Sequence, residues 1–382
     1  MEGVGKMSKG IFFVNYYRIW PVDGGGSRHF SMNILYLHNL FRNIGVLQGL
    51  GSTKDTPIEL TDSVKYCELC DRVYEISHML SFLLFHIWIL AVLLRNHRRK
   101  RIVITGGWSL TLLGYFARLL GNEWINFVDD PLLNIARCKK NIKSRVIFHF
   151  LKRSRNADFT VIANKEEAGE FSHLFNVPIN KIIVIPPVFN SNMIDDREFE
   201  NLLRKKFTSM KILLFFGNMD YDQNVDSLNY ITRDIVPKFR NLNDTCKFVF
   251  AGKGTDAYED DDLCVYMGFL TEPQLNTLIR HSYLVLAPIL EKYRKGIKTK
   301  VLHALSLGVP VLSTPAGVFG LEKEGLPVFI SEIGDFSDTL LELVNGEDRV
   351  EKMKERTIDY IEKNYSEKVM ERWKRIINMG DA

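Results

Sequence analysis

Short runs of β-branched and aromatic residues recur along the chain, and each is followed by a stretch in which apolar residues have helical spacing. In the first half these runs are GIFFVNYY, RIVITGG, WINFVDD, DFTVIAN and KIIVIPPV. The second half begins again with MKILLFFGN and continues with KFVFAGKG, VYMGFL, YLVLAPI, GVPVLSTP and LPVFIS. Strands that alternate with helices are typical of βαβ units and parallel sheets. Two such series predict two doubly wound α/β domains.

A polar segment separates the two series. In IPPVFNSNMIDDREFENLLRKKFTSM two prolines end a strand, and charged residues precede the next one. We therefore expect a first domain over 1–190, a linker over 191–208 and a second domain over 209–364. The charged tail has apolar residues at helical spacing, which predicts closing helices with a break near Asn364 and a last helix within 365–382.

One segment of the first half is apolar on all sides. Residues 79–94, MLSFLLFHIWILAVLL, precede the basic cluster RNHRRKR. Sixteen residues fall short of the ~20 that span hydrocarbon. A buried core helix with a solvated basic end is one interpretation. The other is docking of 79–101 on an anionic membrane surface. We expect no nucleic-acid partner, because no aromatic-interleaved basic groove accompanies the cluster.

Composition indicates the cellular compartment of the protein, and the charged residues are distributed unevenly along the chain. A chain of 382 residues with 46% hydrophobic content can fill two cores. Five scattered cysteines, with one lone CxxC at Cys67 and Cys70, do not make a disulfide framework or a zinc set. The first residues lack the order of a signal peptide, so we expect a cytoplasmic protein, with docking on the inner face of the membrane as the alternative. Residues 77–155 hold fourteen Lys and Arg against three Asp and Glu, which favours an anionic partner.

The stretch GIKTKVLHALSLGVPVLSTPAG, which begins at Gly296, carries the candidate chemistry. Gly296 precedes a predicted helix, and the start of a helix attracts phosphate. Lys298 and Lys300 add full positive charges there. Because loops at the carboxyl ends of parallel strands bind ligands, a nucleotide diphosphate suits this place.

At this point the sequence resembles a family. GIKTKVLHALSLGVPVLSTPAGVFGLE is similar to the nucleotide-sugar signature of the retaining glycosyltransferases of group 1, also called family 4, which have the GT-B fold. The segments KILLFFGNMDYDQNVDSLNYITRDIVPKF, KFVFAGKG and VYMGFLTEPQLNTLIRHSYLVLAPI agree in order and spacing, as does ADFTVIANKEEAGEFSHLFNVPINKIIVIPPV. The likeness covers about 157–377 well; before that it extends only to WPVDGGGSRHF.

The resemblance implies a fold and an activity. Two Rossmann-like domains would face across a cleft, with 365–382 crossing back to the first domain. A retaining hexosyltransferase-type enzyme would move a sugar from a nucleotide-diphosphate donor to an acceptor without a metal or other cofactor. The apolar and basic first half favours a lipid-linked or membrane-proximal acceptor, with a free glycan as the other class.

The resemblance also carries residues over by position. Donor-binding places fall on the glycines that begin at Gly24, with Gly25 and Gly26, and in the second domain on Gly217, Asn218, Gly268, Phe269, Gly296, Ile297, Lys298, Thr299 and Lys300. Where the family commonly has two glutamates, this sequence has Lys295 and His303. Lys295 is therefore a catalytic candidate. His303 can bond a ribose hydroxyl or can be an ordinary half-buried helical residue.

Carboxylates for orienting the acceptor are found at a strand end of the first domain. Asp129 and Asp130 in FVDDP are the catalytic candidates, although acids before a proline are also common helix caps. His29 and His97 are alternatives that the sequence does not rank. Two other functions stay open: a nucleotide-sugar epimerase of the same fold, and a binding subunit that has lost catalysis.

Overall fold

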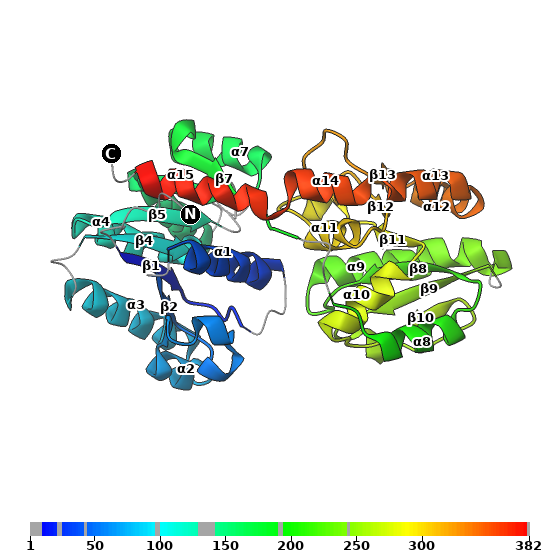
Figure 1. Cartoon of the computed structure of the whole chain (residues 1–382), viewed down its shortest axis with the longest axis horizontal. Coiled ribbons are helices and arrows are strands. Elements are labelled where there is room, and N and C mark those ends of the chain that lie inside the picture. The colour runs from blue at the N-terminus through cyan, green and yellow to red at the C-terminus, as the bar shows by residue number, and fades with distance from the viewer. Residues whose placement is uncertain are drawn as a thin grey trace, which may run out of the picture. The chain divides into compact units, whose positions relative to one another are not determined.

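The computed structural model describes residues 10–20, 25–41, 44–95, 100–128, 142–189, 194–242 and 245–379. The chain divides into two compact units (Figure 1). The first unit comprises Met1–Val188 together with Lys368–Ala382, and the second comprises Phe189–Glu367. Each unit is built around its own parallel sheet.

The first unit holds a seven-stranded sheet in the order β3-β2-β1-β4-β5-β6-β7. All its pairings are parallel. Five strands lie in the predicted runs, whereas β2 and β3 come from segments that the pattern did not single out. The strands are β1 (Gly10–Asn15), β2 (Ile44–Gln48), β3 (Val64–Tyr66), β4 (Arg101–Gly106), β5 (Glu123–Val128), β6 (Phe159–Ile162) and β7 (Ile182–Val184).

Helices cover both faces of this first sheet. Side chains alternate across a strand, so Phe13 of β1 packs in one core cluster and Val14 in the opposite one. The helices are α1 (Gly25–Phe41), α2 (Glu68–Tyr74), α3 (His78–Arg95), α4 (Thr111–Leu119), α6 (Ile142–Leu151) and α7 (Lys165–Phe175). Helix α1 shares the cluster of Phe13, and α2, α3 and α4 share that of Val14.

The end of the chain completes the first core. Helix α15 (Arg372–Met379) follows the short helix η10 (Glu367–Glu371). Trp373 is fully buried there, and its indole Nε1 donates to Asn33 Oδ1 of α1 at 2.7 Å. Its ring also lies 6.1 Å from that of Phe127 on β5. Residues at the two ends of the sequence therefore stabilise one core.

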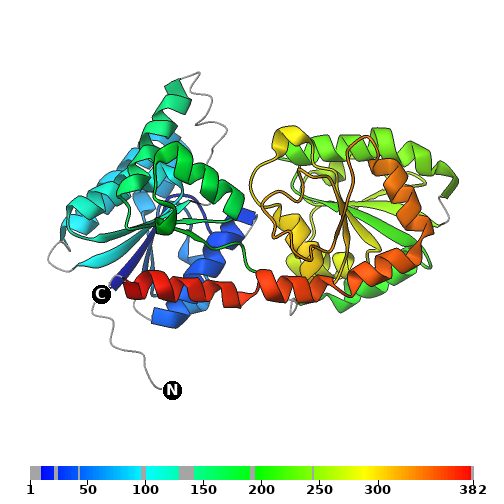
Figure 2. The ribbon, with the colours of Figure 1, turned by 90° about the horizontal axis from the view of Figure 1, so that it is seen from above.

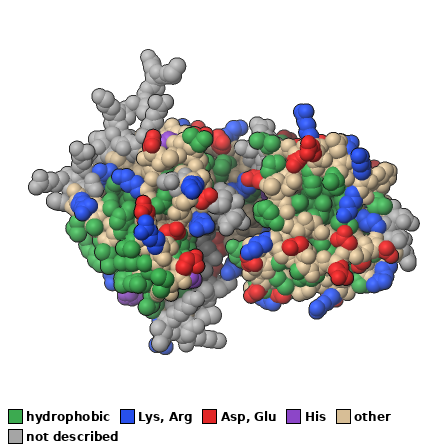
Figure 3. All heavy atoms as spheres, turned by 90° about the horizontal axis from the view of Figure 1, so that it is seen from below, with side chains coloured by type: hydrophobic (Ala, Val, Ile, Leu, Met, Phe, Trp, Pro, Cys, Tyr) green, Lys and Arg blue, Asp and Glu red, His purple; other side chains and the backbone are tan. Residues whose placement is uncertain are grey.

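Helix α3 belongs to this first unit and has two apolar stripes. Ser81, Phe85, Ile89 and Leu93 are buried at intervals of four residues. An opposite stripe of apolar side chains is exposed, and it consists of Leu80 (46%), Leu83 (56%), Ile87 (55%) and Leu94 (54%), with Met79 (83%) at its start. Figure 3 shows hydrophobic side chains gathered on the face of the first unit that α3 covers.

Length and composition alone would let α3 cross a membrane, and it is the one helix among the described residues that passes this test. The fold nevertheless uses it as a covering helix, because Phe85, Ile89 and Leu93 pack against β1, β2 and β4. The buried stripe agrees with the core-helix interpretation, whereas docking on a membrane stays a prediction. One stripe is core, and the other faces outward.

The second unit holds a six-stranded parallel sheet in the order β10-β9-β8-β11-β12-β13. All six strands lie in the predicted runs. They are β8 (Lys211–Phe216), β9 (Cys246–Ala251), β10 (Cys264–Tyr266), β11 (Leu284–Ala287), β12 (Val311–Ser313) and β13 (Val328–Ile330). Figure 2 shows helices on both sides of this sheet.

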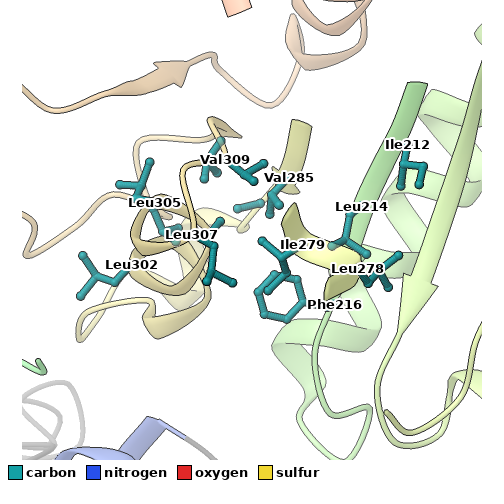
Figure 4. Packing of buried hydrophobic residues seen from close by; sticks show 14 of the residues in the cluster. Ile212, Leu214, Phe216, Leu278, Ile279, Val285, Leu302, Leu305, Leu307 and Val309 are labelled. Carbon is teal, nitrogen blue, oxygen red and sulfur yellow. The ribbon is translucent and has the colours of Figure 1, made fainter. Parts of the chain in front are cut away.

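Alternation along β8 again assigns the two faces of the sheet. Ile212, Leu214 and Phe216 point to the cluster shared with α8, α10, α11 and α14, part of which Figure 4 draws. Leu213 and Phe215 point to the cluster shared with α9, α12 and α13. The bounds are α8 (Arg197–Lys206), α9 (Asp222–Tyr230), α10 (Glu272–Arg280), α11 (Thr299–Ser306), α12 (Phe336–Asn345), α13 (Glu347–Lys354) and α14 (Thr357–Asn364).

The structure describes two connections for which we have expectations from the sequence. The stretch 191–208, expected as a linker, contains helix α8 in its described part, and Leu203 and Phe207 are buried in the core of the second unit. Asp196 caps α8, because its carboxylate accepts the Phe199 N–H at 3.0 Å. The expected break near Asn364 falls where α14 ends. The short helix η10 follows that break and leads into α15.

Candidate functional site in the second unit

The order of strands indicates a candidate binding place at the carboxyl ends of the strands of the second sheet. The chain passes from β8 outward to β9 and β10, then returns to β11 on the other side of β8. Ligands of doubly wound sheets bind at the carboxyl ends of the strands, where the order reverses. In this unit the loops after β8 and β11 lie at that reversal. They contain Gly217 and Asn218 on one side and residues 288–298 on the other.

Three glycines bring backbone close together at this edge. The Gly217 N–H donates to Ala251 O at 2.9 Å, and the Gly252 N–H donates to Gly268 O at 2.8 Å. A Cβ on Gly252, which has φ +126°, would lie 2.1 Å from the Gly217 carbonyl oxygen. Gly268 also has positive φ, at +63°. A side chain at Gly252 would therefore clash with the main chain of Gly217, so this position needs a glycine.

Lys300 in the first turn of α11 reaches the start of α9. Its Nζ donates to Asn224 Oδ1 at 2.7 Å and lies 4.3 Å from the centre of the Phe215 ring. The Asn224 Nδ2 donates in turn to the Asn218 carbonyl oxygen at 2.8 Å. Burial of the ammonium, and then the nearby charge of Lys298, lower the pKa of Lys300 to about 7.

The loop before α11 is held by its own lysine. Lys298 is buried, and its Nζ donates to the carbonyl oxygens of Tyr293 and Lys295 at 2.9 and 2.5 Å. Lys298 stands at the N-cap of α11, but its side chain makes no capping hydrogen bond. Gly296 has φ +58°, a conformation that L side chains rarely adopt. The loop therefore has a defined shape with a cation inside it.

An acidic residue of α9 fixes the same loop from the other side. The Tyr293 hydroxyl donates to Asp226 Oδ2 at 2.8 Å, and Lys292 Nζ lies 2.5 Å from the same oxygen. The ammonium of Lys292, and then the Tyr293 hydroxyl, lower the pKa of Asp226. Asp226 is thus engaged by the Lys292 ammonium and the Tyr293 hydroxyl. Lys300 instead donates its hydrogen bond to the Asn224 amide.

The remaining predicted residues of this loop have different surroundings. Ile297 is partly buried and packs against the main core, and Thr299 begins α11. The Lys295 side chain is exposed. Phe269, after β10, is 74% exposed. Ser313 at the end of β12 and Thr314 after it are buried, and their hydroxyls donate to the main-chain carbonyls of Ala287 and Ile289.

His303 lies one turn further along α11 and is enclosed by the unit. Its Nε2 is 2.8 Å from Asn276 Oδ1, and only 7% of the residue is exposed. The ring lies 5.9 Å from that of Phe189 and 5.8 Å from that of Phe216. This imidazole has a protein partner, so its predicted role in holding a ribose stays a prediction.

Some candidates of the first domain lie within the described residues and others lie outside them. Gly25 and Gly26 open helix α1, whereas Gly24 lies outside the described residues. Asp129, Asp130 and His97 also lie outside them. His29 is buried, and its Nε2 is 3.1 Å from the carbonyl oxygen of Ile185. That environment makes His29 part of the first core.

Sequence reasoning missed three features at the carboxyl ends of the second sheet. Gly252 stands in the quoted AGKG run, yet only its positive φ and its contact with Gly217 reveal why a glycine is needed. Lys253 next to it pairs with Asp220 at 2.6 Å, which joins the loops after β9 and β8. The meeting of Lys300 with Asn224 likewise had no local signal, since 76 residues separate them.

The four cysteines in the described part of the chain are buried and do not form a second site. Cys67, Cys70, Cys246 and Cys264 are buried free thiols. Burial raises the pKa of the Cys70 thiol to about 12, which opposes thiolate chemistry. Within the described residues no three side chains of His, Cys, Asp or Glu gather in a way that could hold a metal ion.

Comparison with known proteins places this geometry in context. Residues 210–346 match the family described as Glycosyl transferases group 1. Comparison with curated proteins at the sequence level finds no significant match. The matched family segment spans β8 to α12 and so includes every loop of the candidate site.

Solved structures resemble the whole chain. HepE from Anabaena in complex with UDP has a TM-score of 0.70 and 12% identity, over 97% of this chain and 100% of that one. Sucrose-phosphate synthase from Thermosynechococcus elongatus has a TM-score of 0.70 and 12% identity, over 97% of each chain. An E. coli structure described as trehalose-6-phosphate bound with UDP-2-fluoro glucose has a TM-score of 0.70 and 12% identity, over 96% and 99%. At this identity the likeness shows the fold, which is GT-B.

Proposed function

Because residues 210–346 match the family of group 1 glycosyltransferases and the chain has a GT-B fold, we propose that this chain is a glycosyltransferase. It moves a sugar from a nucleotide-diphosphate donor to an acceptor. The observation that carries the proposal is the family match over 210–346, in the unit whose strand-reversal edge holds Lys300 and Lys298. The HepE and E. coli structures were solved with UDP or a UDP sugar, which supports a donor of this class.

The chemistry follows from the charges at the edge. As the sugar leaves, negative charge develops on the departing diphosphate, and fixed cations and main-chain N–H groups at that place stabilise it. Lys298 and Lys300 supply the charge in this proposal. The uncapped start of α11 supplies N–H groups beside Gly296. Gly217 and Gly268, with Asn218 and Phe269, line the donor in this proposal, and Gly25 and Gly26 of the first domain are donor-binding candidates by the family resemblance.

Three finer points rest on the family resemblance. The transfer proceeds with retention of anomeric configuration, it needs no metal, and the transferred sugar is a hexose. Asp129 and Asp130 orient the acceptor hydroxyl, and Lys295 acts beside the reacting sugar. Product configuration by NMR and the rate after treatment with a chelator test the first two points directly.

The acceptor is proposed to lie at a membrane. The exposed stripe of α3 is apolar along its length, and Arg95 and Lys100 in the following basic segment are exposed. An apolar face next to cations fits an anionic bilayer surface. The enzyme then acts from the cytoplasm as a peripheral protein on a lipid-linked glycan acceptor.

A thermal-shift screen with UDP-glucose, GDP-mannose and ADP-glucose tests the donor site first. A ligand that binds only the folded state at 100 times its Kd stabilises it by about 2.7 kcal/mol. Transfer is then followed with the donor that binds and with lipid-linked and free glycan acceptors. A screen in which none of the donors shifts the transition would refute the donor site.

One competing function has a specific observation behind it. Lys295 and His303 stand where the family commonly has glutamates, and His303 is engaged by Asn276. These features suit a subunit that binds the donor and has lost catalysis. Saturable donor binding with neither transfer nor donor hydrolysis would favour that function over the enzyme.

A further inference from the structure

The cation at the strand reversal is held in an unusual way. Lys300 and Asn224 come from the first turns of α11 and α9, the helices that follow the two strands flanking the reversal. The Lys300 Nζ donates to Asn224 Oδ1 at 2.7 Å, and Asn224 is itself tied to the Asn218 carbonyl at 2.8 Å. Main chain of the β8 loop thus determines where the ammonium lies.

The packing around Asn224 leaves it little freedom. The residue is only 7% exposed, and a Cβ on Gly217 would lie 2.7 Å from Asn224 Nδ2. The Phe215 ring lies under the Lys300 ammonium at 4.3 Å. An amide orients a cation without neutralising it, whereas a carboxylate at the same place would form an ion pair.

Several charged groups around α11 have other partners or the same sign, and Asp222 of α9 and Asp359 and Glu362 of α14 are exposed. Asp226 of α9 is engaged by Lys292 and Tyr293, and Asp220 of the β8 loop is engaged by Lys253. On α14, which packs against α11, Lys363 pairs with Glu324. The positive charge of Lys298 repels the Lys300 ammonium and lowers the pKa of Lys300.

We propose that Asn224 is the positioning residue for Lys300, and that Lys300 takes up a proton from solvent when the donor diphosphate binds. The inference rests on the proposed function, because it assigns the diphosphate to this cation. Before binding, the Asn224 amide and the Phe215 ring lie beside the Lys300 ammonium but do not neutralise its charge. The diphosphate supplies the missing opposite charge, so the protonated form becomes the stable one.

The sign and size of the effect follow from the pKa of free Lys300, which is about 7. Binding raises this pKa toward the usual value of a lysine, so the affinity is highest at low pH and falls as the pH rises through 7. For a bound pKa well above 8, the affinity at pH 8 is about tenfold lower than at pH 6. Proton uptake is then about 0.9 per donor at pH 8 and about 0.1 at pH 6.

Titration calorimetry measures this uptake in full-length protein, with the donor from UDP-glucose, GDP-mannose and ADP-glucose that binds. Their diphosphate bridge does not titrate between pH 6 and 8. Comparing two buffers of different ionisation enthalpy gives the number of protons. Asn224→Asp keeps the shape of the side chain but pairs with Lys300, so we expect uptake at pH 8 to vanish and affinity to fall about tenfold or more.

Two further variants separate positioning from general damage. Asn229→Asp places the same charge on α9 five residues further on, and should leave both affinity and proton uptake unchanged. Lys300→Met should abolish uptake and remove the pH dependence of binding. Binding without uptake, or equal effects of Asn224→Asp and Asn229→Asp, would overturn the inference alone. Failure of all three donors to bind would overturn it together with the proposed function.

Discussion

Replacing two residues of the exposed α3 stripe tests membrane docking without touching the core. Leu83 and Ile87 are four residues apart on one helical face and are 56% and 55% exposed. Fully burying such a side chain stabilises by about 1.5–3 kcal/mol, so the exposed half of each contributes roughly 1 kcal/mol on a bilayer. Losing both costs about 2 kcal/mol, which is about a 30-fold fall in partition. Two glutamates facing anionic lipid increase the loss.

Co-sedimentation with vesicles measures the partition. We expect the wild type to bind vesicles that contain phosphatidylglycerol more tightly than vesicles of phosphatidylcholine alone, and salt to weaken the binding. Leu83→Glu with Ile87→Glu should abolish it. Neutralising exposed Arg95 and Lys100 should weaken it by about 1 kcal/mol each. Neutralising Arg98, Arg99 and Arg101 as well extends the same test to the whole basic cluster.

A matched control comes from the second unit, where Leu202 of α8 is 54% exposed. Leu202→Glu changes the same chemistry at nearly equal exposure and should partition like the wild type. Melting temperatures of the Leu83, Ile87, Arg95, Lys100 and Leu202 variants should stay close to that of the wild type, because these side chains are exposed. No binding of the wild type to anionic vesicles would refute the reasoning. A dimer that the two glutamates dissociate would also refute it, by showing that the stripe contacts another copy.

Three further substitutions test the packing. Trp373→Ala should lower the stability of the first unit by about 3–5 kcal/mol, which calorimetry would show as a shift of one unfolding transition. Trp373→Phe should lower the stability by less. Equal shifts of the transitions of both units would contradict the assignment of α15 to the first unit. Gly252→Ala should lower the melting temperature of the second unit, since its Cβ would lie 2.1 Å from the Gly217 oxygen, whereas Gly334→Ala, with nothing within 4 Å, should be neutral. His303→Ala should lower the free energy of unfolding by about 1–3 kcal/mol through the lost Asn276 contact. If His303 also holds the ribose, His303→Ala weakens donor binding and His303→Glu is tolerated; unchanged donor affinity in both variants would leave it a packing residue.

The sequence by itself determined the two α/β series and the segment that resembles group 1 glycosyltransferases. Every strand of the second sheet lies in a run that local pattern identified, because a buried parallel strand must be apolar over several consecutive residues. The pattern did not identify β2 and β3, because Gly45 interrupts the apolar residues of β2 and the exposed Lys65 interrupts those of β3. Glycines such as Gly296 were also readable, because a required backbone conformation leaves a glycine in the sequence.

Only the tertiary structure decided which side chains meet and which face outward. Lys300 meets Asn224 over 76 residues of sequence, and Trp373 meets Asn33 over 340. A helix with apolar residues all round gives no local sign of which stripe is covered, so the exposure of Leu83 and the burial of Phe85 depend on the sheet beneath α3. The same holds for His303, whose partner Asn276 comes from another helix. Contacts between distant segments depend on how helices pack on a sheet, and no local pattern records that packing.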